Sequence, residues 1–147
     1  PRRTIRLLLA GAEENGVHGG AAYAAAHADD QHLIAAESDF GAGRVWRFRT
    51  RFAERALPYG RVIQQQLAPL GILPGDNGAF GGADIFALRQ AGVPVADLSQ
   101  DGMDYFDYHH TPNDTLDKID PEALRQNVAA FAVFAYLAAD TDWVFDE

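Results

Sequence analysis

Short strand-like runs alternate with helical runs along this chain, and this alternation constrains the fold more than any other feature. Apolar and β-branched residues predict strands at Thr4–Ala10, His32–Ala36, Arg44–Thr50 and Val93–Leu98. Helical spacing of apolar residues predicts helices at Val17–Ala28, Pro58–Leu67, Asp84–Gln90 and Pro121–Ala139. The alternation is typical of an α/β fold, so we predict a mixed, mostly parallel sheet flanked by helices.

Three regions of the sequence predict more detail. Arg44–Thr50 alternates polar and apolar residues, which predicts a half-exposed strand at a sheet edge, and Gly71–Gly82 predicts a long loop. Asp120 and Pro121 are favourable residues for the start of the last helix. A buried stripe is predicted on that helix, made of Leu124, Val128, Phe131, Ala135 and Ala138.

Composition excludes several classes of function. An apolar content of 48% in 147 residues is enough for the core of one domain. The net charge of −9 argues against a nucleic-acid partner, because phosphate binding needs a basic face. No apolar run approaches the roughly 18 residues of a membrane span, so none is expected in this chain. The chain has no cysteine, which excludes disulfides and thiolate zinc sites and leaves the compartment open.

Polar clusters that could carry chemistry follow the predicted strands. They are Glu13-Glu14, Glu37-Ser38-Asp39, and the segment Tyr108–Thr115 with its two histidines. Carboxylates and imidazoles without sulfur are the ligands of a hydrolytic zinc ion, and parallel strands would bring all three clusters to one edge of the sheet. Plainer explanations are a solvated acidic loop, a turn residue at Asp39, and a polar surface loop around the histidines.

The order of these motifs resembles that of the two-zinc aminopeptidases, which are zinc exopeptidases. The resemblance rests on Ala12–Val17, Glu37–Asp39, Gly82–Ile85 and His109–Thr115, and it extends over nearly the whole chain. It is closest to the plasma glutamate carboxypeptidase, or carboxypeptidase Q-like, branch. It implies the three-layer sandwich of these enzymes and a zinc metallopeptidase activity in the complete protein.

The resemblance also implies roles for particular residues. Glu13 matches the general base, Glu14 and His110 match ligands of the first zinc ion, and Asp39 matches a ligand of the second. His109 matches no ligand. The remaining candidates are groups that line the pocket or support the ligands, namely Asp114, Asp84 and Tyr108.

The chain departs from the family pattern at its beginning. The family also uses a histidine and a metal-bridging aspartate from earlier segments, and Pro1–Ala12 supplies neither. We therefore expect residues 1–147 to be the C-terminal portion of a single peptidase catalytic domain, truncated on its N-terminal side and inactive alone. The alternative is a degenerate homologue that has lost catalysis.

The function expected from the resemblance is exopeptidase cleavage of peptides or dipeptides, of the aminopeptidase or dipeptidase type. A complete site would hold two zinc ions, which we expect to be absent or partial in this chain. The resemblance implies a secreted or periplasmic protein, and exposed strand edges would favour self-association. The alternatives are a one-zinc acyltransferase similar to glutaminyl cyclase and a non-catalytic binding domain on the same fold.

Overall fold

A mixed four-stranded sheet forms the centre of the computed structural model, which describes residues 1–146. Its strands are β1 (Ala35–Glu37), β2 (Val45–Arg51), β3 (Leu73–Pro74) and β4 (Val95–Gln100), and their order across the sheet is β1-β4-β2-β3. The pairs β1–β4 and β2–β3 are parallel, whereas β2 and β4 are antiparallel. The predicted α/β class is therefore confirmed.

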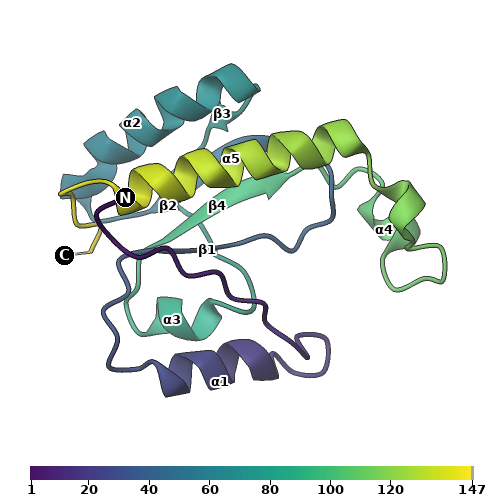
Figure 1. Ribbon diagram of the computed structural model, residues 1–147, viewed down its shortest axis with the longest axis horizontal. Helices are drawn as coiled ribbons and strands as arrows, with labels where there is room; N and C mark the ends of the chain where they lie inside the picture. Colours follow the sequence, from purple (N-terminus) through teal and green to yellow (C-terminus); the bar gives the residue numbers. More distant parts are fainter. Residues whose placement is uncertain (147) are drawn as a thin grey trace.

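Helices cover both faces of this sheet. They are α1 (His18–Ala26), α2 (Leu57–Leu67), α3 (Phe86–Gln90), α4 (Tyr105–Tyr108) and α5 (Pro121–Ala139), with 3₁₀ turns η1 (Glu54–Ala56), η2 (Ala68–Leu70) and η3 (Leu116–Lys118). Figure 1 shows α2 and α5 on one side, α1 and α3 on the other, and α4 at the end remote from both termini. No helix within residues 1–146 is long and apolar enough to cross a bilayer.

The larger core lies between the sheet and the layer of α2 and α5. Its most deeply buried large side chains are Val45, Ile63, Leu67, Ile72 and Phe145. A smaller cluster of Ala79, Ile85, Leu88 and Val95 lies on the side of α1 and α3. The two cores fix the three layers of the molecule, and the smaller one supports the turn before α3.

The predicted strand at Thr4–Ala10 does not form in the described structure. The amide of Arg3 donates to the carbonyl of Ala139 at 3.0 Å, but residues 4–10 belong to no strand of the sheet. Leu7 is 84% exposed and Leu9 is 87% exposed. The apolar pattern of the segment favours an extended backbone, but a strand also needs a neighbour with which to pair.

The predicted edge position of Arg44–Thr50 is wrong. The corresponding strand β2 lies between β4 and β3, because Leu73–Pro74 within the predicted loop Gly71–Gly82 adds a short strand beside it. The alternation itself does correspond to one buried face, which carries Phe48 and Thr50.

Helix α5 has the predicted bounds, and the Asp120 side chain accepts a hydrogen bond from the amide of Glu122 at 2.9 Å. The predicted buried stripe is wrong at two positions, since Leu124 is 46% exposed and Val128 is 62% exposed. The buried residues are instead Ala123, Gln126, Asn127, Ala130, Phe134, Ala138 and Ala139.

Two buried amide side chains explain this rotation of α5. The Gln126 carbonyl accepts from the Val45 amide at 2.8 Å, and its amide donates to the Val45 carbonyl at 2.7 Å. The Asn127 amide donates to the Gly43 carbonyl at 2.7 Å. These side chains satisfy backbone groups at the irregular start of β2, where the register shifts between Val45 and Arg47.

Gln126→Leu is expected to destabilise the fold by about 2–5 kcal/mol, because each buried backbone group left unpaired costs about 1–3 kcal/mol. Urea denaturation followed by circular dichroism measures the change. The matched control is Gln65→Leu on the exposed face of α2, which we expect to stay within about 0.5 kcal/mol of the parent chain. Equal stability of the two variants would contradict this explanation of the α5 orientation.

Candidate metal centre

Glu13 and Glu14 lie on a tight turn that leads into α1. The Glu13 carbonyl accepts from the amides of Gly16 at 2.9 Å and Val17 at 2.8 Å. Ala12 and Val17 have φ values of 60° and 58°, which is the left-handed region that side chains rarely adopt. The turn therefore holds the two carboxylates in a strained loop next to the helix.

His110 reaches this turn from the loop after α4. Its Nε2 lies 2.8 Å from Oε1 of Glu14, and both side chains are about 60% exposed. His110 has a φ of 60°, and among residues 1–146 the only other non-glycine residues with positive φ are Ala12 and Val17. Backbone strain of this kind concentrates at functional sites, and here all of it lies around one contact.

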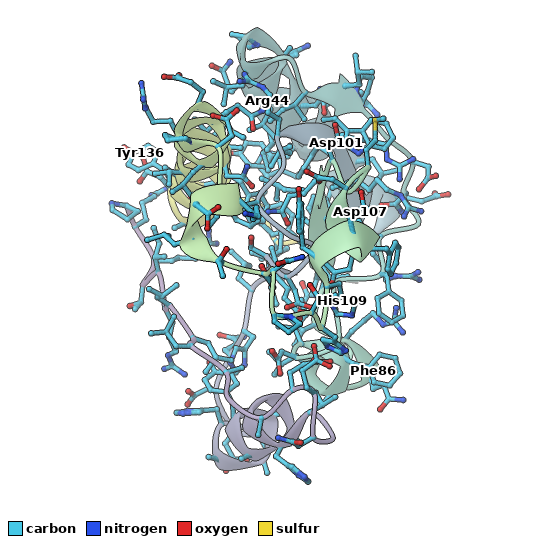
Figure 2. All side chains as sticks on the ribbon, turned by 90° about the vertical axis from the view of Figure 1, so that its right-hand side faces the viewer. Arg44, Phe86, Asp101, Asp107, His109 and Tyr136 are labelled. Atoms are coloured by element: carbon cyan, nitrogen blue, oxygen red, sulfur yellow. The ribbon has the colours of Figure 1, made fainter. Side chains whose placement is uncertain are left out.

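A line of stacked aromatic rings supports the two histidines. Ring centroids are 4.3 Å apart for Phe40 and Tyr105, 4.6 Å for Tyr105 and His109, and 3.7 Å for His109 and His110. Figure 2 shows His109 between α4 and the layer that contains α3. The stack links the loop after β1 to the loop after β4.

The structure places His109 in the same cluster as Glu14 and His110, although the motif assigns it no role. Each of the three side chains offers a ligand atom, and these atoms all lie within 4.8 Å of one another. His109 is half-buried, whereas Glu14 and His110 are exposed. The pair of adjacent histidines in the sequence could have indicated a role for His109. Only the fold shows that both rings lie close to the carboxylate of Glu14.

The surroundings of the turn shift the pKa values of the neighbouring carboxyls of Glu13 and Glu14 in opposite directions. Partial desolvation raises the pKa of Glu13, the charges of Glu14, Asp39 and Asp84 raise it further, and His110 opposes the shift. The hydrogen bond with His110 lowers the pKa of Glu14. The pKa values of the two carboxyls thus shift in opposite directions, and Glu14 is the one whose ionised form, the form that a metal ligand needs, is favoured.

Asp39 lies near this group, after the end of β1. Partial desolvation raises its pKa, and the charges of Asp84 and Glu14 add to the effect. Asp84 lies in the turn before α3, where its amide donates to the carboxylate of Glu37 at 2.9 Å. The structure therefore gathers Glu13, Glu14, Asp39 and Asp84 into one negative region beside His110.

Tyr108 and Asp114 are placed around the turn that follows the histidines. The Tyr108 carbonyl accepts from the Thr111 amide at 2.9 Å and from its hydroxyl at 2.7 Å. The Asp114 amide donates to the Thr111 carbonyl at 3.1 Å, and the charge of Asp114 contributes to the raised pKa of Tyr105. These contacts hold the loop; none of those described for residues 1–146 joins the Asp114 carboxylate to His110.

Carboxylates and imidazoles gathered at the end of an α/β sheet are typical of metal-dependent hydrolases. The comparisons identify the class, because the sequence profile of peptidase family M28 matches residues 1–135. The chain belongs to this metallopeptidase family, which confirms the resemblance drawn from its motifs.

Particular relatives agree with this assignment. Carboxypeptidase Q of Rattus norvegicus and that of Homo sapiens are each 34% identical to the chain over 144 residues, covering 97% of the chain and 30% of the relative. A peptidase M28 precursor from Shewanella amazonensis has a crystal structure that matches with a TM-score of 0.89 and 51% identity, over 95% of this chain and 32% of that one. The chain thus spans about a third of the length of these relatives.

Proposed function

We propose that this chain supplies metal ligands and the general base of a zinc exopeptidase of the aminopeptidase or dipeptidase type, with peptides or dipeptides as substrates. The observation that carries the proposal is the contact between Glu14 and His110, 2.8 Å apart, whose charges both act on the Glu13 carboxylate. Membership of peptidase family M28 supports the same reaction class.

The donor set fits a zinc ion. Glu14 and His110 would hold the first ion, and Asp39 would contribute to a second. Catalytic zinc usually takes three protein ligands from histidine and carboxylate, so the first ion would need one ligand beyond Glu14 and His110. His109 lies in the same cluster and stacks on His110, and it is proposed to hold that ring in place. When bound, zinc polarises the peptide carbonyl and lowers the pKa of a bound water.

Glu13 is the residue proposed to move the proton. Its carboxylate would accept a proton from the attacking water and pass it to the nitrogen of the leaving amine, as the C–N bond breaks and a C–O bond forms. A raised pKa suits this role, because a base that is too acidic holds the proton poorly. Asp84, Tyr108 and Asp114 are proposed to line the pocket or to hold the loop that carries His110.

One observation favours a second function, a one-zinc acyltransferase similar to glutaminyl cyclase. Among the described residues, only Glu14, His109 and His110 form a cluster of three potential ligands. An N-terminal glutaminyl peptide distinguishes the two enzymes, since cyclisation releases ammonia and keeps the peptide whole, whereas an exopeptidase releases an amino acid. A protein that binds the peptide without either product would be a binding domain on the same fold.

Zinc titration of the 147-residue chain tests the donor set. We expect one weak zinc site at most, because the second ion has Asp39 as its only assigned ligand here. Isothermal calorimetry measures the number of sites and their affinity, with Glu54→Gln on the exposed turn η1 as the control that should bind like the parent. Two tight sites on this chain, or unchanged binding in a Glu14→Ala, His110→Ala double variant, would refute the assignment.

Secretion or export to the periplasm is proposed from the family resemblance. The relative from Shewanella amazonensis is described as a precursor, a word used for chains that are processed after synthesis. Fractionation of cells that express the full-length protein tests this proposal, and a protein found only in the cytoplasm would contradict it.

Self-association of the 147-residue chain is also expected. Residues 4–10 lie extended outside the sheet with Leu7 and Leu9 exposed, and β3 forms a sheet edge with Leu73 59% exposed. Unpaired extended segments with apolar side chains are templates for pairing between chains. Sizing with light scattering should show a dimer or larger species, and a monodisperse monomer at all concentrations would contradict this.

A further inference from the structure

The carboxylate of Glu37 connects the end of β1 to the turn before α3. Its Oε2 accepts a hydrogen bond from the amide of Asp84 at 2.9 Å and a second from the amide of Ile85 at 3.2 Å. Both donors lie at the start of a short helix whose own residues supply no side-chain cap. Glu37 thus supports, from a distant part of the sequence, a turn whose local backbone contact is the hydrogen bond from the Phe86 amide to the Ala83 carbonyl at 3.2 Å.

The backbone around this connection leaves no free space. Gly82 has a φ of 120°, and a Cβ atom at this position would lie 2.3 Å from the Glu37 carboxylate. On the other side of the turn, a Cβ atom on Gly20 of α1 would lie 2.1 Å from the carbonyl of Asp84. The turn is therefore fixed between α1 and Glu37, and glycine is required at both points of close approach.

Fold stability alone does not account for the two carboxylates at this connection. Oε1 of Glu37 and Oδ1 of Asp84 are both buried, and neither has a hydrogen-bond partner among residues 1–146. A buried carboxylate oxygen without a partner costs stability, and such groups in native structures call for a functional explanation. The position of Glu37 and Asp84 beside the candidate metal centre offers an explanation. Asp39 follows Glu37 by two residues, and the charge of Asp84 acts on both Asp39 and Glu13.

We propose that Glu37 is a positioning residue of the metallopeptidase site: it ties the turn that carries Asp84 to the strand end that carries Asp39, so that the two carboxylates keep a fixed separation. This role rests on the proposed function. Glu37 touches neither metal nor substrate in it, and acts through the backbone amides of Asp84 and Ile85. Groups that orient metal ligands in this way typically change metal affinity or activity by about 10–100-fold when they are removed.

The test compares Glu37→Ala and Glu37→Gln in the full-length protein, with Glu54→Ala as the control. Hydrogen exchange at the amides of Asp84 and Ile85 should accelerate by about tenfold or more in Glu37→Ala, because both amides lose their acceptor. Zinc affinity, measured by competition with a chelator, should fall by about 10–100-fold, and kcat should fall with KM nearly unchanged. Glu37→Gln keeps an acceptor oxygen and should restore most of each property.

A second variant covers the possibility that Glu37→Ala fails to fold. Glu37→Asp keeps a carboxylate but shortens its reach to the amides of Asp84 and Ile85, so exchange, affinity and kcat should shift in the same direction. Normal zinc affinity and kcat in Glu37→Ala, with faster amide exchange, would show that Glu37 has a purely structural role. This result would overturn the positioning role and leave the proposed function intact. A wild-type protein that neither binds zinc nor cleaves peptides would instead refute the proposed function, and the positioning role with it.

Discussion

Turnover of a dipeptide substrate by the full-length protein is expected to fall by about 10²- to 10⁴-fold when Glu13 is replaced by glutamine, because this is the usual contribution of a general base. The glutamine keeps the shape of the side chain and loses the ability to accept a proton. The zinc content of Glu13→Gln, measured by atomic emission, should stay near that of the parent, because the role proposed for Glu13 is proton transfer and not metal binding.

Glu14→Gln is the matched comparison, since it makes the same chemical change at the next residue. This variant should lose zinc as well as activity, because the carboxylate that faces His110 at 2.8 Å is removed. The two assignments predict different metal contents for variants of equal size and equal charge. Equal loss of zinc in both would refute the division of roles between the neighbouring carboxylates.

His110→Ala is expected to weaken zinc binding by more than the roughly 100-fold that removal of an outer group can cost, because His110 is proposed to bind the ion directly. His109→Ala should have the smaller effect. Its ring stacks on His110 with a centroid distance of 3.7 Å, so its loss should disorder the ligand without deleting it. Chelator competition on the full-length variants measures both affinities.

The reverse order, with His109→Ala the more damaging change, would show that the motif was aligned one residue out of register. It would then be His109 that holds the ion, and the left-handed backbone at His110 would need another explanation.

The sequence predicts those parts of the fold whose signals are local. Helix α5 has the predicted bounds because Asp120 and Pro121 specify its start. The apolar pattern of Thr4–Ala10 is equally clear, but a strand depends on a partner that the pattern does not contain. The two-residue strand β3 is specified by its pairing with β2 and has no recognisable pattern of its own.

The orientation of α5 shows a different limit of sequence patterns. Hydrophobic spacing placed Leu124 and Val128 in the core, whereas the structure buries Gln126 and Asn127 there to satisfy backbone groups of β2 and the loop before it. The spacing of apolar residues in one helix contains no information about which backbone groups of another element need hydrogen-bond partners.

The candidate site also combines features that the sequence predicts with features that depend on how distant segments pack. Motif order was enough to select Glu14 and His110, which the structure brings into contact. The place of His109 in that cluster and the connection made by Glu37 depend on how distant loops pack, so no spacing in the sequence reveals them. The strained backbone at Ala12, Val17 and His110 is likewise visible only in the fold.

Anomalous diffraction at the zinc edge, from crystals of the full-length protein grown with zinc, would locate the metal ion relative to Glu14 and His110. We expect a zinc peak bonded to a carboxylate oxygen of Glu14 and a ring nitrogen of His110, each at about 2.0–2.2 Å, which is the normal range for these ligands. The contact between Glu14 and His110 would then be replaced by their bonds to the metal. Zinc bound at other residues, with Glu14 and His110 still paired to each other, would show that these two side chains are not the metal ligands.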